Sequence, residues 1–217
     1  MNATQPSPAG AEAARQAPWR QHVTQQHAQQ QDAARELAGR MLDWAQRRVS
    51  APALLLGAAR GFVEWAHYPQ PDAIDPVSGW KFYYHAHAAS QRLYHEHGHF
   101  HVFLPAGHDL WTHWIGLTLD RRGLPLRLFT TNRWVTDEAW RSSGELAGEH
   151  PRLRDAAPTE VGAWLESLLC VYADDVAQLQ RERDLRLAGR GLDDHRLRIP
   201  SQCRVNLLER LQALGVQ

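Results

Sequence analysis

The sequence predicts an α+β domain in which a four- to five-stranded antiparallel sheet is flanked by N-terminal and C-terminal helices. Two observations carry this prediction. Short extended segments separated by turn signals fill the middle of the chain, and apolar residues at helical spacing lie before and after them. The length of 217 residues suits one domain, and 43% apolar and 22% charged residues are typical of a folded globular protein.

The N-terminal part of the chain divides into a leader and a helical region. Residues 1–31 are rich in Ala, Gln, Pro and Ser without a sustained apolar period, which predicts a disordered leader. We therefore expect a single α+β domain over residues 32–217. Within it, helical spacing of apolar residues starts near Asp32 and ends at Pro52, and a second helix fits residues 55–65.

The predicted sheet follows an irregular loop over residues 67–79, where Pro, Asp and Gly are dense. The first extended segment is rich in aromatic residues, the second alternates strictly, and the last two flank a turn at residues 120–123. The short links between these segments predict an antiparallel meander. The expected strands cover residues 80–87, 94–104, 110–120 and 124–131.

Helices are expected again after the sheet. Thr136 is a suitable N-cap, and acidic residues follow it, which predicts a helix over residues 136–147. The clearest apolar stripe of the chain predicts a long helix over residues 159–189 that packs across one face of the sheet. Residues 192–200 are expected to be extended or a loop, and residues 205–214 a short terminal helix.

Composition excludes several classes of protein. The formal net charge is +0 and the pI is about 7.3, so no broad positive field is available to bind a nucleic acid polymer. The N-terminus has no basic region followed by an apolar run, and the most apolar stretch, residues 51–59, is too short to span a bilayer. We therefore expect no membrane partner and a cytoplasmic location. The two cysteines, Cys170 and Cys203, lack the spacing of a disulfide framework or a thiolate zinc site.

Histidine is the residue type that stands out. Nine of the 13 histidines lie between His67 and His113. Because side chains alternate along a strand, the odd-numbered histidines of the segment 94–104 should share one face, while Glu96 should face away unless a bulge forms at Gly98. An antiparallel register that opposes His87 and His95 would place six histidines on this face: His85, His87, His95, His97, His99 and His101.

These imidazoles predict a transition-metal site. Opposed Cβ atoms on neighbouring strands lie about 4.5–5.5 Å apart, which brings ring nitrogens within reach of one ion. Imidazole without thiolate suits Zn, Fe, Cu or Ni, and we favour Zn or Fe. A structural or proton-shuttling histidine network is the alternative, because so many imidazoles must stay neutral or share hydrogen bonds. The predicted metal ligands are His85, His87, His97, His99 and His101.

Other side chains are candidates for supporting roles. The candidates for a carboxylate ligand are Asp72, Asp75, Glu96 and Asp109, and those for further imidazoles are His67, His108 and His113. Thr130, Asn132 and Arg133 leave a strand and approach a helix start, where they are expected to orient an anionic or carbonyl-bearing substrate. We therefore take His99 and Arg133 as the candidate catalytic residues.

The motifs FYYHAH (82–87), EHGHFHVF (96–103) and LFTTNRWV (128–135) resemble a bacterial family described only as a domain of unknown function. This resemblance would cover roughly residues 35–210 and implies that the central region is one domain. The family brings no established activity, so the resemblance assigns no catalytic residue.

A shorter segment, His97-Gly-His-Phe-His101 with the apolar residues after it, is similar to the signature of the histidine triad nucleotide hydrolases and transferases. That resemblance implies His99 as the nucleophile toward a phosphate, with His97 and His101 in support. It spans about ten residues and departs from the family pattern at Gly98, where a larger apolar residue is usual.

The sequence therefore predicts a metal-binding protein, and most simply a metal-dependent enzyme, hydrolase or oxidoreductase, that acts on a small molecule. The alternatives are a nucleotide hydrolase or transferase of the histidine triad type and a non-catalytic metal-binding or sensing module. A catalytic metal would need an open coordination position beside a cleft, whereas a sensing module would have a closed ligand shell.

Overall fold

The computed structural model describes residues 8–57 and 62–216, with side chains described from Val23 onward. Six strands form one antiparallel sheet in the order β1-β2-β3-β4-β5-β6, so that each strand pairs with its neighbours along the chain. The strands are β1 (Tyr68–Ile74), β2 (Lys81–His85), β3 (Gly98–Gly107), β4 (Leu110–Leu119), β5 (Pro125–Phe129) and β6 (Gln202–Arg204).

The predicted α+β class is confirmed, and the sheet has one or two strands more than expected. Both unforeseen strands lie at the edges of the sheet. Strand β1 falls within the segment predicted as an irregular loop, because Pro69 and Pro71 disfavour a central strand. An edge strand tolerates proline, since the N–H groups on its outer side need no partner in the sheet. Strand β6 has only three residues, too few for a period to be recognised.

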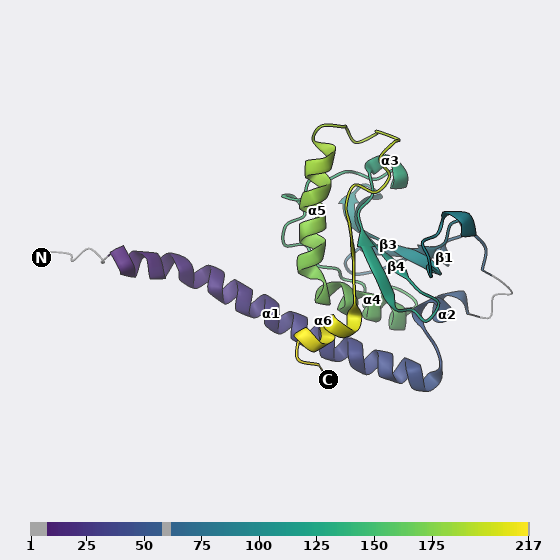
Figure 1. The fold of residues 1–217 in the computed structure, drawn as a ribbon, viewed down its shortest axis with the longest axis horizontal. Coiled ribbons are helices and arrows are strands. Elements are labelled where there is room, and N and C mark those ends of the chain that lie inside the picture. Colours follow the sequence, from purple (N-terminus) through teal and green to yellow (C-terminus); the bar gives the residue numbers. More distant parts are fainter. Residues whose placement is uncertain (1–7, 58–61, 217) are drawn as a thin grey trace, which may run out of the picture.

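Helices α1 and α2 precede the sheet in the sequence, α3 to α5 lie between β5 and β6, and α6 follows β6 (Figure 1). They are α1 (Pro8–Arg47), α2 (Ala51–Leu56), α3 (Arg133–Thr136), α4 (Thr159–Val171), α5 (Ala173–Leu187) and α6 (Leu207–Ala213), with a 3-10 turn at Ala89–Gln91. The N-terminal half of α1 projects away from the body of the molecule, and its C-terminal half lies along it. No helix in the described part of the chain combines the length and the apolar character that a membrane crossing requires.

Helix boundaries differ from the prediction at several places. Helix α1 begins at Pro8, so residues 8–31 of the expected leader are helical, while residues 1–7 lie outside the described residues. The division into a leader and one domain stays a prediction. The second predicted helix ends at Leu56, before the C-cap Gly57; its residues 58–61 are outside the described part.

The two later helix predictions also need correction. The helix expected over residues 136–147 is wrong, because α3 ends at Thr136 and Asp137 adopts a left-handed conformation with φ 48°. The single helix expected over residues 159–189 is broken at Tyr172, whose φ of −108° and ψ of 21° separate α4 from α5. Neither break involves Gly or Pro, so the sequence carried no clear signal for it.

The two faces of the sheet have different neighbours. On one face Phe100 packs against Trp164 of α4 at 6.0 Å between ring centroids, and Trp164 in turn lies 5.7 Å from Trp44 of α1. Helix α4 therefore lies between this face and α1, and all three aromatic side chains are buried. Burial of such side chains contributes about 1.5–3 kcal/mol each. This aromatic face holds the main core of the protein.

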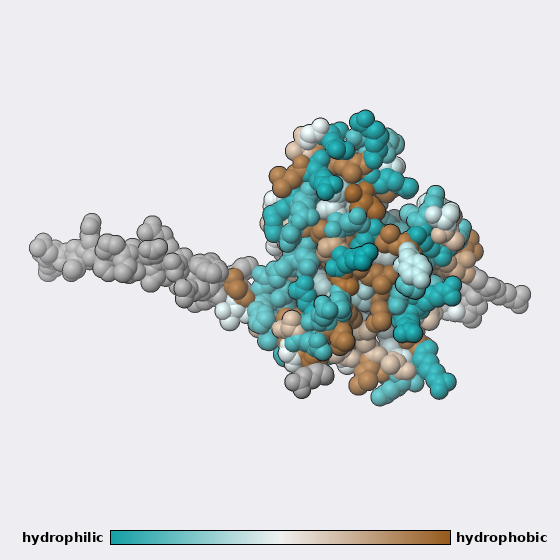
Figure 2. All heavy atoms as spheres, in the orientation of Figure 1, coloured by the Kyte–Doolittle hydropathy of each residue, from teal (hydrophilic) through white to brown (hydrophobic). Residues whose placement is uncertain are grey.

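The other face of the sheet carries the histidines and is bordered by irregular segments rather than by α4. Along β3, buried Phe100 and Val102 point to the core, and buried His99 and His101 point to the opposite side. The surface seen in Figure 2 has hydrophobic side chains in small groups among hydrophilic ones, not in one continuous patch. Because the histidines of this second face are buried, the candidate site lies beneath the surface of the protein.

Candidate metal centre

The pairing of β2 with β3 brings histidines together. His85 lies opposite His99, and Tyr83 opposite His101, two residues from the register that would oppose His87 and His95. The parity argument does not depend on which of these registers forms, because a shift of two residues keeps the same side chains on the same face. His85, His99 and His101 therefore share one face.

These three histidines form a compact cluster that we call the histidine centre: His85, His99 and His101. One ring nitrogen from each lies within 4.8 Å of the other two, and all three residues are buried. The Nε2 atoms of His85 and His99 are 2.8 Å apart. An ion with bonds of about 2.0–2.1 Å needs tetrahedral ligand atoms roughly 3.3 Å apart, a separation that small ring rotations in this cluster would give.

Glu96 orients His99 within the centre. Its Oε1 accepts a hydrogen bond from His99 Nδ1 at 2.8 Å, and its Oε2 accepts one from the backbone N–H of Leu93 at 3.0 Å. Burial alone would raise the pKa of Glu96, but these hydrogen bonds outweigh it and hold the pKa below its ordinary value. An ionised carboxylate only accepts, so His99 carries its proton on Nδ1 and directs the Nε2 lone pair into the centre.

The expectation that Glu96 faces away from the histidines was wrong. Regular extended structure begins only at Gly98, and the preceding residues form a turn in which His95 has φ 68°. The strict alternation assumed from residue 94 therefore fails before Gly98. A Cβ atom on Gly98 would lie 2.6 Å from the carbonyl oxygen of His85, so only glycine permits this close approach of the two chains.

The same turn removes His97 from the histidine centre. Its Nδ1 lies 2.7 Å from the hydroxyl of Tyr84, and its ring is 5.1 Å from that of Phe62. Tyr84 pairs with Phe100 and packs on its ring, so it belongs to the aromatic face and His97 lies on the opposite side of the sheet from His99. The arrangement implied by the histidine triad resemblance, with His97 beside His99, is not the one seen here.

His87 lies beside the centre but outside it. Its ring stacks on Trp65 with centroids 4.4 Å apart, and its centroid is 4.9 Å from that of His99. Burial, followed by the neighbouring His99, lowers its pKa to about 4. His67 stacks on Tyr83 at 3.7 Å, with its Nδ1 2.9 Å from Asp72. Both rings contribute to the surroundings of the three central imidazoles.

A second support reaches the centre from β4. The Nδ1 of His101 lies 2.9 Å from Nε2 of His113, which leaves Nε2 of His101 for a ligand. Glu138 accepts a hydrogen bond from the backbone N–H of His113, and burial raises the pKa of this carboxyl group to about 8. The sequence analysis treated Glu138 only as a helix-start residue, and no local pattern indicated its contact with β4.

Burial disfavours the charged form of two of the three central imidazoles, His85 and His101. Burial, and then the proximity of His99, lowers the pKa of His85 to about 2. Burial and the neighbour His113 likewise hold the pKa of His101 well below its ordinary value. Neutral imidazole is the form that binds metal, so these groups are preorganised as ligands. His85 Nδ1 is buried and has no hydrogen-bond partner among the described residues.

The histidine centre opens into a cavity of about 610 Å³. Its walls are mainly aromatic and aliphatic, and they include Trp65, Phe129 and Trp134. Phe129 lies 5.6 Å from the ring of His99, a position that requires Gly116 because a Cβ there would fall 2.2 Å from Cζ of Phe129. The cavity size and apolar lining are typical of small-molecule sites.

The arginines of the cavity wall do not include Arg133, the arginine that the sequence suggested. Arg133 does not line it but forms an ion pair with Asp193, with side chains 42% and 56% exposed. Instead, Arg127 of β5 and Arg198 lie in the cavity wall. The sequence offered one signal for Arg127: it occupies the same face of β5 as Phe129, two residues away.

Comparison with known proteins gives one match. A family model matches residues 31–205, a range that contains the whole sheet and the histidine centre, and its description is "Domain of unknown function (DUF6969)". No curated protein and no solved structure shows significant similarity to the chain.

Proposed function

The chain belongs to the DUF6969 family, a domain of unknown function, and we propose that it is a metal-dependent enzyme acting on a small molecule. The histidine centre would bind one transition-metal ion through His85, His99 and His101. One observation carries the proposal: three buried imidazoles converge at the wall of a 610 Å³ cavity.

The surroundings of the ligands support a metal rather than a structural role. Metal-binding histidines usually donate their second ring N–H to a carboxylate or another acceptor, which fixes the ring and strengthens the ligand. Glu96 takes this role for His99, and His113 for His101.

The cavity supports catalysis rather than storage or sensing. Three protein ligands leave a fourth position, and catalytic zinc sites keep that position for water or substrate. Here the open side of the centre faces the cavity. A bound ion would act there as a Lewis acid or would lower the pKa of water. Zn and Fe are the favoured ions, because both accept imidazole ligands.

Metal analysis tests the ligand assignment, and the fold offers a matched control. We expect about one equivalent of transition metal in the wild-type protein and in His97→Ala, since His97 lies on the other face of the sheet. His99→Ala should lose the metal while retaining its circular dichroism spectrum. Metal absent from the wild type after growth and reconstitution with Zn²⁺ or Fe²⁺, or retained by His99→Ala, would refute the proposal.

A second measurement separates an enzyme site from a closed metal site. The protein reconstituted with Co²⁺ should change its visible absorption when azide is added, because azide can enter an open coordination position. A spectrum that azide leaves unchanged would indicate a saturated ligand shell and a non-catalytic module.

A further inference from the structure

The cavity wall beside the histidine centre contains two cations, Arg127 and Arg198, and the charge of Glu96 acts on Arg127 without forming an ion pair with it. The guanidinium of Arg127 donates to neutral oxygens only, to Gln202 Oε1 at 2.6 Å and to Thr118 Oγ1 at 3.4 Å. Among the residues that the structure describes, neither Arg127 nor Arg198 forms an ion pair. Burial lowers the pKa of Arg127, which shows that its charge is held partly out of water.

Strand pairing places Arg127 in line with the centre. His85 pairs with His99, His99 with Thr118, and Thr118 with Arg127, so these residues form one row across β2, β3, β4 and β5. Paired residues point to the same side of a sheet, and two strand spacings separate His99 from Arg127 by roughly 10 Å. A small molecule can bridge that distance.

With a metal ion in the histidine centre, the net charge of the cavity would favour binding of an anionic substrate. Its charged side chains are Glu96, Asp137, Arg127 and Arg198, two anions and two cations that cancel. A divalent ion in the histidine centre would leave a net charge of +2. Bound substrate must compensate that charge, because unbalanced charge in a cavity with aromatic walls is costly.

An unpartnered hydroxyl in the same cavity indicates a ligand that accepts hydrogen bonds. Thr131 is 1% exposed and lines the cavity, and its Oγ1 has no hydrogen-bond partner among the described residues. Buried hydroxyls without partners are rare in native proteins and call for an explanation. A ligand oxygen would provide the missing acceptor. The nearby walls formed by Trp134, Val135 and Ile199 would hold an apolar ligand body.

We propose that the substrate is an organic carboxylate with an apolar body, whose carboxylate is held by Arg127 beside the metal ion. The planar guanidinium of arginine matches the two oxygens of a carboxylate. This inference rests on the proposed metal site and names the substrate class for it. Arg198, which lies 5.8 Å from the ring of Trp134, adds positive charge at the cavity wall.

The test compares acids with their amides. Benzoate, phenylacetate and 3-phenylpropanoate, each beside the matching amide, are titrated by calorimetry into the Zn²⁺-loaded protein. We expect at least one acid to bind roughly tenfold or more tightly than its amide, a difference of about 1.4 kcal/mol, because a hydrogen bond between charged groups is stronger than one to a neutral amide. Equal binding of acid and amide, absence of acid binding, or tighter binding of phenyl phosphate overturns the inference.

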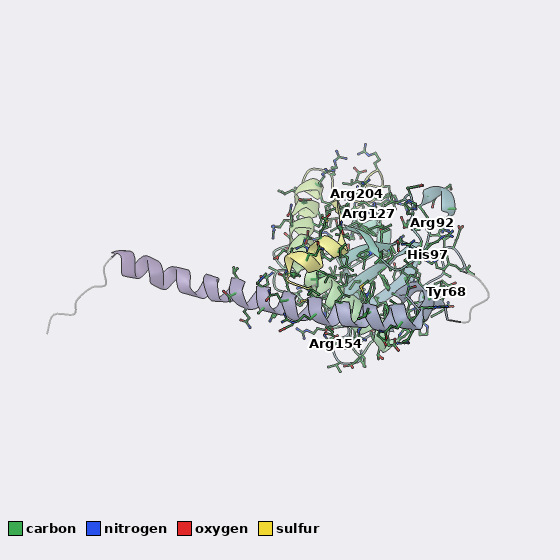
Figure 3. The ribbon with its side chains drawn as sticks, turned by 60° about the horizontal axis from the view of Figure 1, so that its bottom comes forward. Tyr68, Arg92, His97, Arg127, Arg154 and Arg204 are labelled. Atoms are coloured by element: carbon green, nitrogen blue, oxygen red, sulfur yellow. The ribbon has the colours of Figure 1, made fainter. Side chains whose placement is uncertain are left out.

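Variants assign the effect to Arg127. Arg127→Gln should abolish the preference for the acid, and Arg127→Lys should reduce it, at unchanged zinc content and melting temperature. Arg204 is the matched control: it pairs with Arg127 on the neighbouring strand, is exposed and does not line the cavity, so Arg204→Gln should bind as the wild type does (Figure 3).

Zinc content, measured in the same samples, separates the two proposals. A protein without zinc fails the proposed function, whereas a zinc-loaded protein with no preference for the acid fails only this inference. An acid preference that survives Arg127→Gln also overturns the role of Arg127.

Discussion

Gly116→Ala is predicted to destabilise the protein and to displace Phe129 from the histidine centre. The added Cβ would lie 2.2 Å from Cζ of Phe129 and 2.4 Å from its Cε2, well inside van der Waals contact. The ring must therefore move, and Gly116 is the cross-strand partner of both His101 and Phe129. Overpacking of this kind typically costs about 1–3 kcal/mol.

For a chain of this size, that loss corresponds to a melting temperature lower by roughly 2–12 °C. Thermal unfolding of Gly116→Ala measures it, and the double variant Gly116→Ala/Phe129→Ala tests the cause. Removing the ring relieves the contact, so the cost of the Gly116 substitution should be smaller in the Phe129→Ala background. Additive costs, or a Gly116→Ala protein as stable as the wild type, would refute the reasoning.

Two further predictions concern the support of the site and of the fold. Glu96→Gln should weaken Zn²⁺ binding by about 10–100-fold in a chelator competition, because His99 loses a charged hydrogen-bond acceptor. The control Glu64→Gln changes an exposed carboxylate and should leave Zn²⁺ binding unchanged. Equal losses in the two variants would contradict the role of Glu96 in orienting His99. The side-chain hydrogen bond with Arg154 lowers the pKa of Glu36 to about 2 from 4.5, so this contribution is present above pH 4.5 and is lost as the pH falls toward 2. In urea unfolding, Arg154→Ala should be less stable than the wild type by about 1 kcal/mol at pH 7, a modest loss because the Arg154–Glu36 pair is partly exposed. The difference in unfolding free energy should be smaller at pH 3. A difference that does not change with pH would argue against a contribution from this ion pair.

Alternation along the strands predicted the common face of the three residues in the histidine centre. His85, His99 and His101 follow the period of two within β2 and β3, so their common side was predictable without coordinates. His97 and Glu96 were not, because they precede Gly98, where the chain is a turn and the period does not apply. The left-handed conformation of His95, which sets this turn, is rare outside glycine and carries little sequence signal.

Contacts between distant segments account for the rest of what the sequence could not show. Glu138 reaches the backbone of His113 across 25 residues, and Arg198 enters the cavity wall from a loop after α5. The sequence suggested Arg133 for binding a substrate, but its guanidinium forms an ion pair with Asp193. Such contacts depend on how the loops pack over the sheet, and the local hydrophobic pattern of a sequence does not predict this.

The division of labour between the two sides of β3 has a consequence for engineering. Phe100 and Val102 anchor the strand against the helices, while His99 and His101 face away from that packing. Exchanging an imidazole of the proposed metal site for a thiolate or a carboxylate would thus change the set of ligand atoms without disturbing the packing of Phe100 against α4. His99 and His101 of β3 are therefore two positions at which the ligands of the proposed site can be exchanged separately.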